Sequence, residues 1–348
     1  MVRFHEIRSL GVGAWVVVLS LITQTAPGRE VKLVICPQKV SAEAGEYTLL
    51  PPQVALTDAD AVPLYDKAIK ALPGKASDNQ VQQYLKMEID KLPADQVEQA
   101  LRPYVESLKY AAQATKCRGC KWPAGKLETF TVKVEEWHKL AYAVQLWARE
   151  EIAQGSPEGA ILSLQIGFGM ARHFVQGSNI LLCSRGMSTA SMMCREIERY
   201  VQMEDAPNLY AALAALPRPF FADVEKVIES EERGFPSKPP AGATRAQFES
   251  DLKSSKASHD YWRALAKRLD SDLAALQCVE AIRSYAASHG GQLPQTLAEI
   301  KEASTPNDPV TGAAFRYTRT GAMAVLETTA PAAANEKDIL RYQIVVKN

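Results

Sequence analysis

Apolar positions recur at helical spacing along most of the chain, and the clearest run extends from residue 134 to residue 202. Three helices are predicted there, at Val134–Gln154, Pro157–Gln176 and Asn179–Gln202, and only Gly-Ser dipeptides separate them. Helices joined by so few residues must lie antiparallel. This region therefore predicts a helical hairpin with a third helix packed on it.

The third of these helices carries a regular apolar seam. Its inward positions follow one another at spacings of four, three, four, three and four residues: Cys183, Met187, Ala190, Cys194, Ile197 and Val201. Such a seam is typical of a helix with one buried face. At the helical rise, Cys183 and Cys194 stand about 16 Å apart, which is beyond the reach of a disulfide. We interpret both as buried thiols that act as small hydrophobic side chains.

Shorter helical patterns flank this core. Before it, helices are predicted over residues 60–72, 79–92 and 93–112, the last kinked at Pro103, and after it over residues 208–216 and 220–233. Between them, Leu127 to Val134 alternates apolar residues with threonine, which predicts a short strand or an extended arm. The chain is therefore expected to be mainly α, an antiparallel helical bundle whose body spans residues 60–233.

The last third of the chain has a different pattern. A Pro- and Gly-rich linker is predicted over residues 234–244, followed by a long charged helix over Arg245–Ala287 with a candidate break near Ser254–Ser258. Alternating residues then predict strands at Phe315–Arg319, Ala322–Thr328 and Ile339–Val346. Residues 245–348 should form a small α+β module, a long helix plus a small antiparallel sheet.

The N-terminal segment predicts export. Arg3 and Arg8 precede an apolar run, Gly11–Ile22, which is shorter than the roughly 20 residues of a membrane span and typical of a signal peptide. Residues 1–28 are expected to be a cleaved signal peptide or an uncleaved N-terminal anchor, so the protein should be exported (periplasmic, envelope-associated or secreted). Residues 29–59 follow as an extended lead-in, in which Val31–Ile35 predicts a short strand.

The composition and the motifs limit the classes of function that we expect for this protein. Forty Lys and Arg balance forty Asp and Glu, so no overall positive field favours nucleic-acid binding, and we expect none. The sequence contains no Gly-rich phosphate loop, nucleophile elbow or His-Glu-x-x-His motif. No reaction and no cofactor is indicated by these patterns.

The C-terminal residues carry a resemblance. After the long helix come Gly290-Gly291, Leu293-Pro294, Leu297, Asp308-Pro309, Thr311-Gly312 and Tyr317. This order is similar to the C-terminal half of type II secretion pseudopilins, and it implies a long helix that turns into a small sheet. The N-terminus lacks the Gly-Phe-Thr-Leu-x-Glu-like start on which a prepilin peptidase acts, so the resemblance concerns the module and not a pilin subunit.

A broader resemblance covers residues 64–233. The Cys-x-x-Cys-Lys-Trp-Pro break is followed by the hairpin positions Leu140-Ala141, Ala153, Gly155, Ala160 and Ala171-Arg172-His173. This pattern resembles an uncharacterised family of exported bacterial envelope proteins with a helical body. The hairpin also looks like a single, over-long tetratricopeptide unit. These resemblances imply a fold and a location in the envelope, and no activity.

The sharpest local feature is Cys117-x-x-Cys120. In an exported protein this pair is a candidate for a redox-active site, for half of a zinc site, or for a structural disulfide, within the pair or with Cys36 or Cys278. A thioredoxin-type site needs a helix directly after the motif, and Trp122-Pro123 is incompatible with one there. No second Cys-x-x-Cys or His-x3-His supplies further zinc ligands. We favour the structural disulfide and expect no metal site.

A second candidate lies at one end of the predicted hairpin. The start of the first helix should face the end of the second, which places Glu136 and His138 near Arg172 and His173. We consider this polar cluster a candidate functional site. The alternative interpretation is that these residues form an exposed set of salt bridges at the helix ends.

The expected function is that of a non-catalytic exported scaffold or binding protein of the cell envelope, with another envelope protein as its partner. Two alternatives stay open: a hydrolase-type enzyme with a cleft in the helical body, and a thiol redox or metal-handling protein that uses Cys117 and Cys120. Membrane contact is expected only through an uncleaved N-terminal segment.

Overall fold

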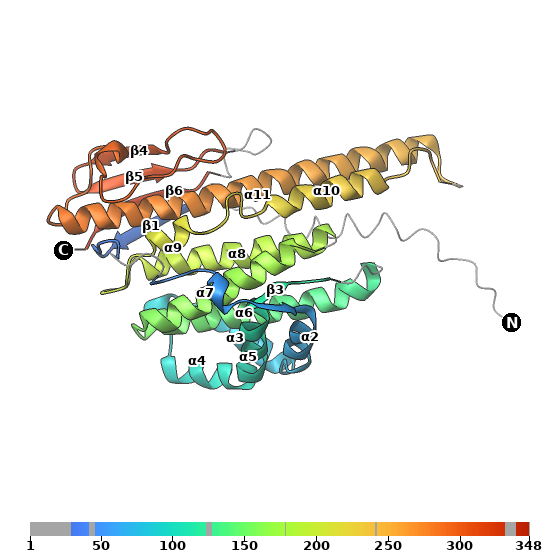
Figure 1. Ribbon diagram of the computed structural model, residues 1–348, viewed down its shortest axis with the longest axis horizontal. Coiled ribbons are helices and arrows are strands. Elements are labelled where there is room, and N and C mark those ends of the chain that lie inside the picture. Colours follow the sequence, from blue (N-terminus) through green and yellow to red (C-terminus); the bar gives the residue numbers. More distant parts are fainter. Residues whose placement is uncertain are drawn as a thin grey trace.

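The computed structural model describes residues 29–41, 46–122, 127–177, 179–240, 242–330 and 339–347. The predicted signal or anchor segment, residues 1–28, lies outside these ranges. Within them the chain is mainly α-helical, with a small sheet built largely from C-terminal strands (Figure 1). No helix in these ranges combines the length and the hydropathy that a membrane crossing requires.

The three central helices are those that the apolar spacing predicts: α6 (Leu127–Ala153), α7 (Pro157–Val175) and α8 (Ile180–Tyr200). They pack on one another. α8 begins where the Asn179 side chain accepts a hydrogen bond from the Leu182 amide, a side-chain N-cap. The strand or arm expected over residues 127–134 is wrong, because α6 begins at Leu127. A few alternating residues also fit the first turns of a helix, and a long helix propagates readily into them.

Gly186 allows α7 and α8 to approach closely. A Cβ added there would lie 2.7 Å from the Ala171 carbonyl oxygen and 3.0 Å from the Val175 backbone nitrogen. Because backbone atoms cannot swing aside, Gly186→Ala should push the helices apart and lower the free energy of unfolding by about 1–3 kcal/mol. Urea denaturation measures this change. Gly234→Ala is the matched control, because its Cβ meets nothing within 4 Å, and equal losses in the two variants would contradict the prediction.

Smaller helices complete the helical body. Before α6 lie α2 (Val62–Lys70), α3 (Lys75–Leu85), α4 (Ala94–Leu101) and α5 (Val105–Thr115), and after α8 lie α9 (Tyr210–Ala214) and α10 (Ala222–Gly234). Pro103 lies in the three-residue 3-10 turn that joins α4 directly to α5, so the helix is interrupted at the expected position. The helix expected over 79–92 ends early, at Leu85, and a short 3-10 turn over Ile89–Lys91 follows it.

The helix α11 (Arg245–Ser288) is continuous, so the candidate break near Ser254–Ser258 does not occur. No Gly or Pro lies there to interrupt the backbone hydrogen bonds. The segment expected to be a linker, residues 234–244, connects α10 to α11. Figure 1 shows α11 between the sheet and α8, and buried side chains from before and after this segment belong to one hydrophobic cluster.

The C-terminal sheet has a strand that the sequence did not place there. Its order is β1 (Glu30–Ile35), β6 (Arg341–Val346), β5 (Met323–Glu327) and β4 (Arg316–Thr320). The three C-terminal strands are antiparallel, as predicted, but β1 pairs with β6 in parallel. The expectation of a purely antiparallel sheet within residues 245–348 is therefore wrong. Alternation identifies a strand without identifying its neighbour.

Candidate functional site

A cavity of about 260 Å³ lies beside α5 and α7. Its other walls are strand β3 (Cys117–Gly119) and the segment that precedes strand β2 (Thr57–Asp60). The lining residues are Leu50, Pro51, Gln53, Leu56, Thr115, Cys117, Arg118, Gly169, Arg172 and His173. The cavity thus joins Cys117 and Arg118 of the Cys-x-x-Cys motif with Arg172 and His173 of the expected polar cluster.

A two-stranded parallel sheet holds the cysteine motif in place. β2 and β3 pair with Thr57 opposite Cys117 and Asp60 opposite Gly119. The Asp60 carboxylate accepts hydrogen bonds from the Val62 amide at 3.1 Å and from the Lys121 amide at 3.0 Å. One carboxylate therefore fixes the start of α2 to the segment that follows β3.

The structure corrects the expected disulfide. All six cysteines are buried free thiols, so Cys117 bonds neither Cys120 nor the other expected partners, Cys36 and Cys278. In an extended segment such as β3, side chains three residues apart turn to opposite faces, which does not favour a bridge within the motif. Burial raises the pKa of the Cys117 thiol and of the Cys120 thiol. Both therefore stay protonated at neutral pH, and the thiol is the unreactive form.

His173 is held as a neutral ring by two hydrogen bonds. Its Nε2 lies 3.1 Å from the Cys117 carbonyl oxygen, which can only accept, so Nε2 carries the proton. Its Nδ1 then accepts a hydrogen bond from the Tyr65 hydroxyl at 2.9 Å. Burial lowers the pKa of His173 to about 4. With its lone pair engaged and its pKa low, this imidazole is poorly suited to act as a general base.

The lowered pKa of His173 predicts a pH dependence of stability. Its pKa falls from 6.5 to about 4 in the folded state, so between these values the unfolded state binds a proton that the folded state does not. Stability from this group is therefore lost as pH falls, by about 2 kcal/mol between pH 7 and pH 5. We expect His173→Gln to destabilise the protein less at pH 5 than at pH 7 by this amount. Urea midpoints at the two pH values test this, and an unchanged difference would contradict it.

Arg172 differs from the other polar residues of the cavity. It is half-buried, and it has no hydrogen bond or ion pair with any residue that the structure describes. The neighbouring Arg118 donates to the Gln53 side-chain oxygen at 3.1 Å and pairs with the exposed Asp58 carboxylate at 2.8 Å. No Asp or Glu is among the lining residues. The cavity therefore has a positive electrostatic character.

Glu136 and His138 lie elsewhere, so the four-residue cluster expected from the hairpin is wrong. His138 stacks on Tyr142 and its Nδ1 accepts a hydrogen bond from Arg185 of α8 at 3.0 Å. No hydrogen bond, ion pair or ring contact among the described residues joins Glu136 or His138 to Arg172 or His173. Antiparallel packing brings the two helix ends together, but the rotation of each helix about its axis decides which side chains meet.

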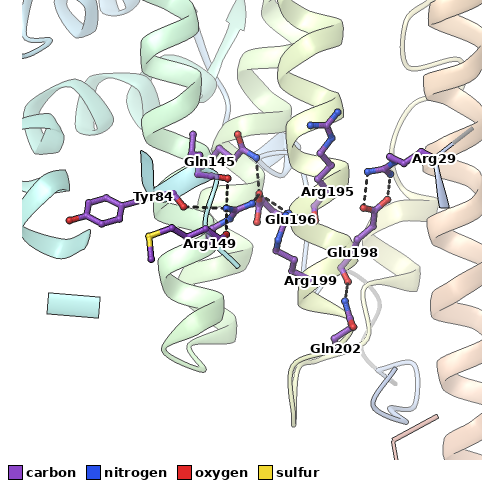
Figure 2. Close-up of polar contacts among 11 residues, drawn as sticks. Arg29, Tyr84, Gln145, Arg149, Arg195, Glu196, Glu198, Arg199 and Gln202 are labelled. Carbon is purple, nitrogen blue, oxygen red and sulfur yellow. Dashed lines mark hydrogen bonds and ion pairs between the residues drawn. The ribbon is translucent and has the colours of Figure 1, made fainter. Parts of the chain in front are cut away.

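A second polar cluster is buried between α6 and α8. Figure 2 shows Arg149 and Glu196 pointing toward each other there. Arg149 lies 3.5 Å from the Glu196 carboxylate, which also accepts hydrogen bonds from Gln145 at 2.7 Å and Arg199 at 3.1 Å. The Arg149 Nη1 atom donates to backbone carbonyls at the end of α3, including that of Leu85 at 2.6 Å. These bonds join three helices, and we interpret the cluster as structural.

A separate ion pair connects α8 to the sheet. Figure 2 shows Arg29 directed toward Glu198. Arg29 donates to the Glu198 carboxylate at 3.0 Å, and the Tyr342 hydroxyl donates to the same carboxylate at 2.8 Å. Arg29 precedes β1 and Tyr342 lies on β6. The pair therefore attaches the parallel strand pair to α8.

Sequence reasoning did not identify Arg118, Gln53 or Thr115 as cavity residues. Arg118 lies inside the Cys-x-x-Cys motif, and its position next to Cys117 on β3 was the available signal. Gln53 and Thr115 carry no motif, and only the packing of their segments around α7 brings them to the cavity.

Within the described ranges, no group of three or more His, Cys, Asp or Glu side chains is arranged to hold a metal ion. Comparisons of the chain with family models, with curated proteins and with solved structures gave no match. The described residues thus form a mainly α-helical protein with a small cavity that two arginines help to line.

Proposed function

We propose that this protein is a non-catalytic scaffold or binding protein of the bacterial cell envelope. One observation carries the proposal: the thiol and the imidazole at the cavity are uncharged and engaged, whereas the Arg172 guanidinium is charged and has no acceptor among the described residues. Such a set of groups can hold a ligand, but it supplies neither an activated nucleophile nor a general base.

Location in the envelope rests on the sequence. The signal-like N-terminal segment supports export, and the two resemblances support an envelope protein with a tetratricopeptide-like hairpin in its helical bundle. The succession of α11 and three antiparallel strands supports the likeness of the C-terminal module to pseudopilins. The partner that we propose is another envelope protein, with no role for nucleic acid. The hydrolase and thiol or metal alternatives gain no support from the described residues.

Native mass spectrometry of the protein purified from an envelope fraction tests the proposal. We expect the wild-type protein to carry a bound component, a small molecule or a protein, that denaturation releases. Leu56→Trp should reduce this component, because a large side chain then occupies the cavity. Val54→Trp is the matched control, since Val54 is 96% exposed and does not line the cavity.

Two results would contradict the proposal. One is a wild-type protein that carries no bound component. The other is a component that Leu56→Trp retains as fully as the wild-type protein does.

A further inference from the structure

The cavity combines an unpartnered cation with an apolar wall. Arg172 has no acceptor in the described part of the chain, and Arg118 adds a second guanidinium whose carboxylate partner, Asp58, has a side chain 90% exposed to solvent. Leu50, Pro51 and Leu56 supply the apolar side. A half-buried guanidinium without an acceptor can make a charge-assisted hydrogen bond to an anion. The cavity can therefore accept an anion from outside the described chain.

The geometry of a guanidinium selects among anions. Its planar fork of donors matches the two oxygens of a carboxylate or phosphate. A phosphate ion is strongly hydrated and offers nothing to an apolar wall, whereas a carboxylic acid carries one charge and an apolar body. One unpartnered guanidinium facing three apolar side chains fits the carboxylic acid better.

The size of the cavity limits the ligand. Its volume of about 260 Å³ lies just below the usual range for sites of drug-sized ligands. A small molecule therefore fits it better than a drug-sized one.

We infer that the cavity binds a small monocarboxylic acid, whose carboxylate pairs with Arg172 and whose apolar part contacts Leu50, Pro51 and Leu56. The inference rests on the proposed function, in which the cavity is the ligand site. Cys117 and His173 form part of the wall and do not change charge on binding. Affinity should therefore stay constant above neutral pH.

Calorimetric titration with benzoate and with its neutral analogue benzamide tests the inference. We expect benzoate to bind the wild-type protein and Arg172→Gln to weaken this binding at least tenfold, while benzamide binds both proteins weakly. Arg102→Gln is the matched control, because Arg102 is exposed, pairs with Glu98 and lies outside the cavity. It should bind benzoate as the wild-type protein does. A competing titration with inorganic phosphate should leave benzoate binding unchanged.

The outcomes separate this inference from the proposed function. Benzoate binding that survives Arg172→Gln, equal binding of benzamide, or displacement by phosphate would each overturn the monocarboxylate inference and leave the cavity as a ligand site. Absence of benzoate binding would also overturn it. If native mass spectrometry still finds a component that Leu56→Trp removes, the binding function stands; if it finds none, both fail.

Discussion

Arg283→Met should lower the free energy of unfolding by about 3–5 kcal/mol, because it leaves a buried carboxylate without its partner. Arg283 and Glu280 are both fully buried. The guanidinium donates to the two Glu280 oxygens at 3.0 and 2.9 Å, to the Cys36 carbonyl at 2.9 Å and to the Ala206 carbonyl at 2.9 Å. One side chain thus joins α11, the end of β1 and the connection after α8. Urea denaturation followed by circular dichroism measures the loss.

Two further variants test the cause of this loss. Glu280→Met combined with Arg283→Met should be less destabilised than Arg283→Met alone, because no uncompensated charge remains. Arg102→Met removes an exposed helical ion pair with Glu98 and should change stability by less than about 0.5 kcal/mol. Equal losses in Arg283→Met and Arg102→Met would show that the buried pair is unimportant.

The loss in Arg283→Met should also depend on pH. Burial already raises the pKa of Glu280, and Arg283 opposes that rise. Without Arg283 the folded-state pKa rises further above the unfolded value, so the penalty is fully present above that pKa and disappears as pH falls through it. Arg283→Met should therefore approach the stability of the wild-type protein at acidic pH.

Arg149→Met has the second-largest expected effect, a loss of about 3 kcal/mol in the free energy of unfolding. Arg149 is 2% exposed. Besides Leu85, it donates to the Met87 carbonyl at 3.1 Å, so it satisfies backbone carbonyls at and beyond the C-terminus of α3. Glu196 keeps Arg199 and Gln145 as partners when Arg149 is lost, and we therefore expect a smaller loss than for Arg283.

Hydrogen exchange distinguishes the two variants. Arg149→Met should increase exchange of the amides in α3, residues 75–85, before it affects the C-terminal sheet. Arg283→Met should instead increase exchange in β1 and β6. Arg149→Lys should behave like Arg149→Met, because a single ammonium cannot reach both the carbonyl groups and the carboxylate. A uniform increase in both variants would contradict the separate roles assigned to these residues.

Helical spacing was enough to predict the core of the fold. The seam of α8 and the dipeptides between the central helices depend on local periodicity, which the sequence displays directly. Neither the pairing of β1 with β6 nor the burial of Arg283 is local. On a charged helix, Glu280 and Arg283 at i and i+3 have the same pattern as a solvated pair, and only the packing of β1 and the segment at Ala206 against α11 buries them.

The sequence predicted residues of the candidate site from separate patterns, but not that these residues lie together. Cys117 came from a motif and Arg172 and His173 from a hairpin end, but their meeting depends on β3 packing against α7. His138 was misplaced for a related reason. Its neighbour Trp137 faces α7, where its ring lies 5.6 Å from that of Phe174, and one residue along a helix turns the next side chain by about 100°. His138 therefore meets α8 instead.

The parallel pairing of β1 with β6 also constrains when the protein can fold. Residues 30–35 have no partner in the sheet until residues 341–346 have been synthesised, and pairings so distant in sequence form slowly because a long loop must close first. The remaining strands can associate earlier, since they are neighbours in the chain. If the protein is exported as we propose, this late pairing favours a chain that stays loosely folded, and so suitable for transport, until its synthesis is nearly complete.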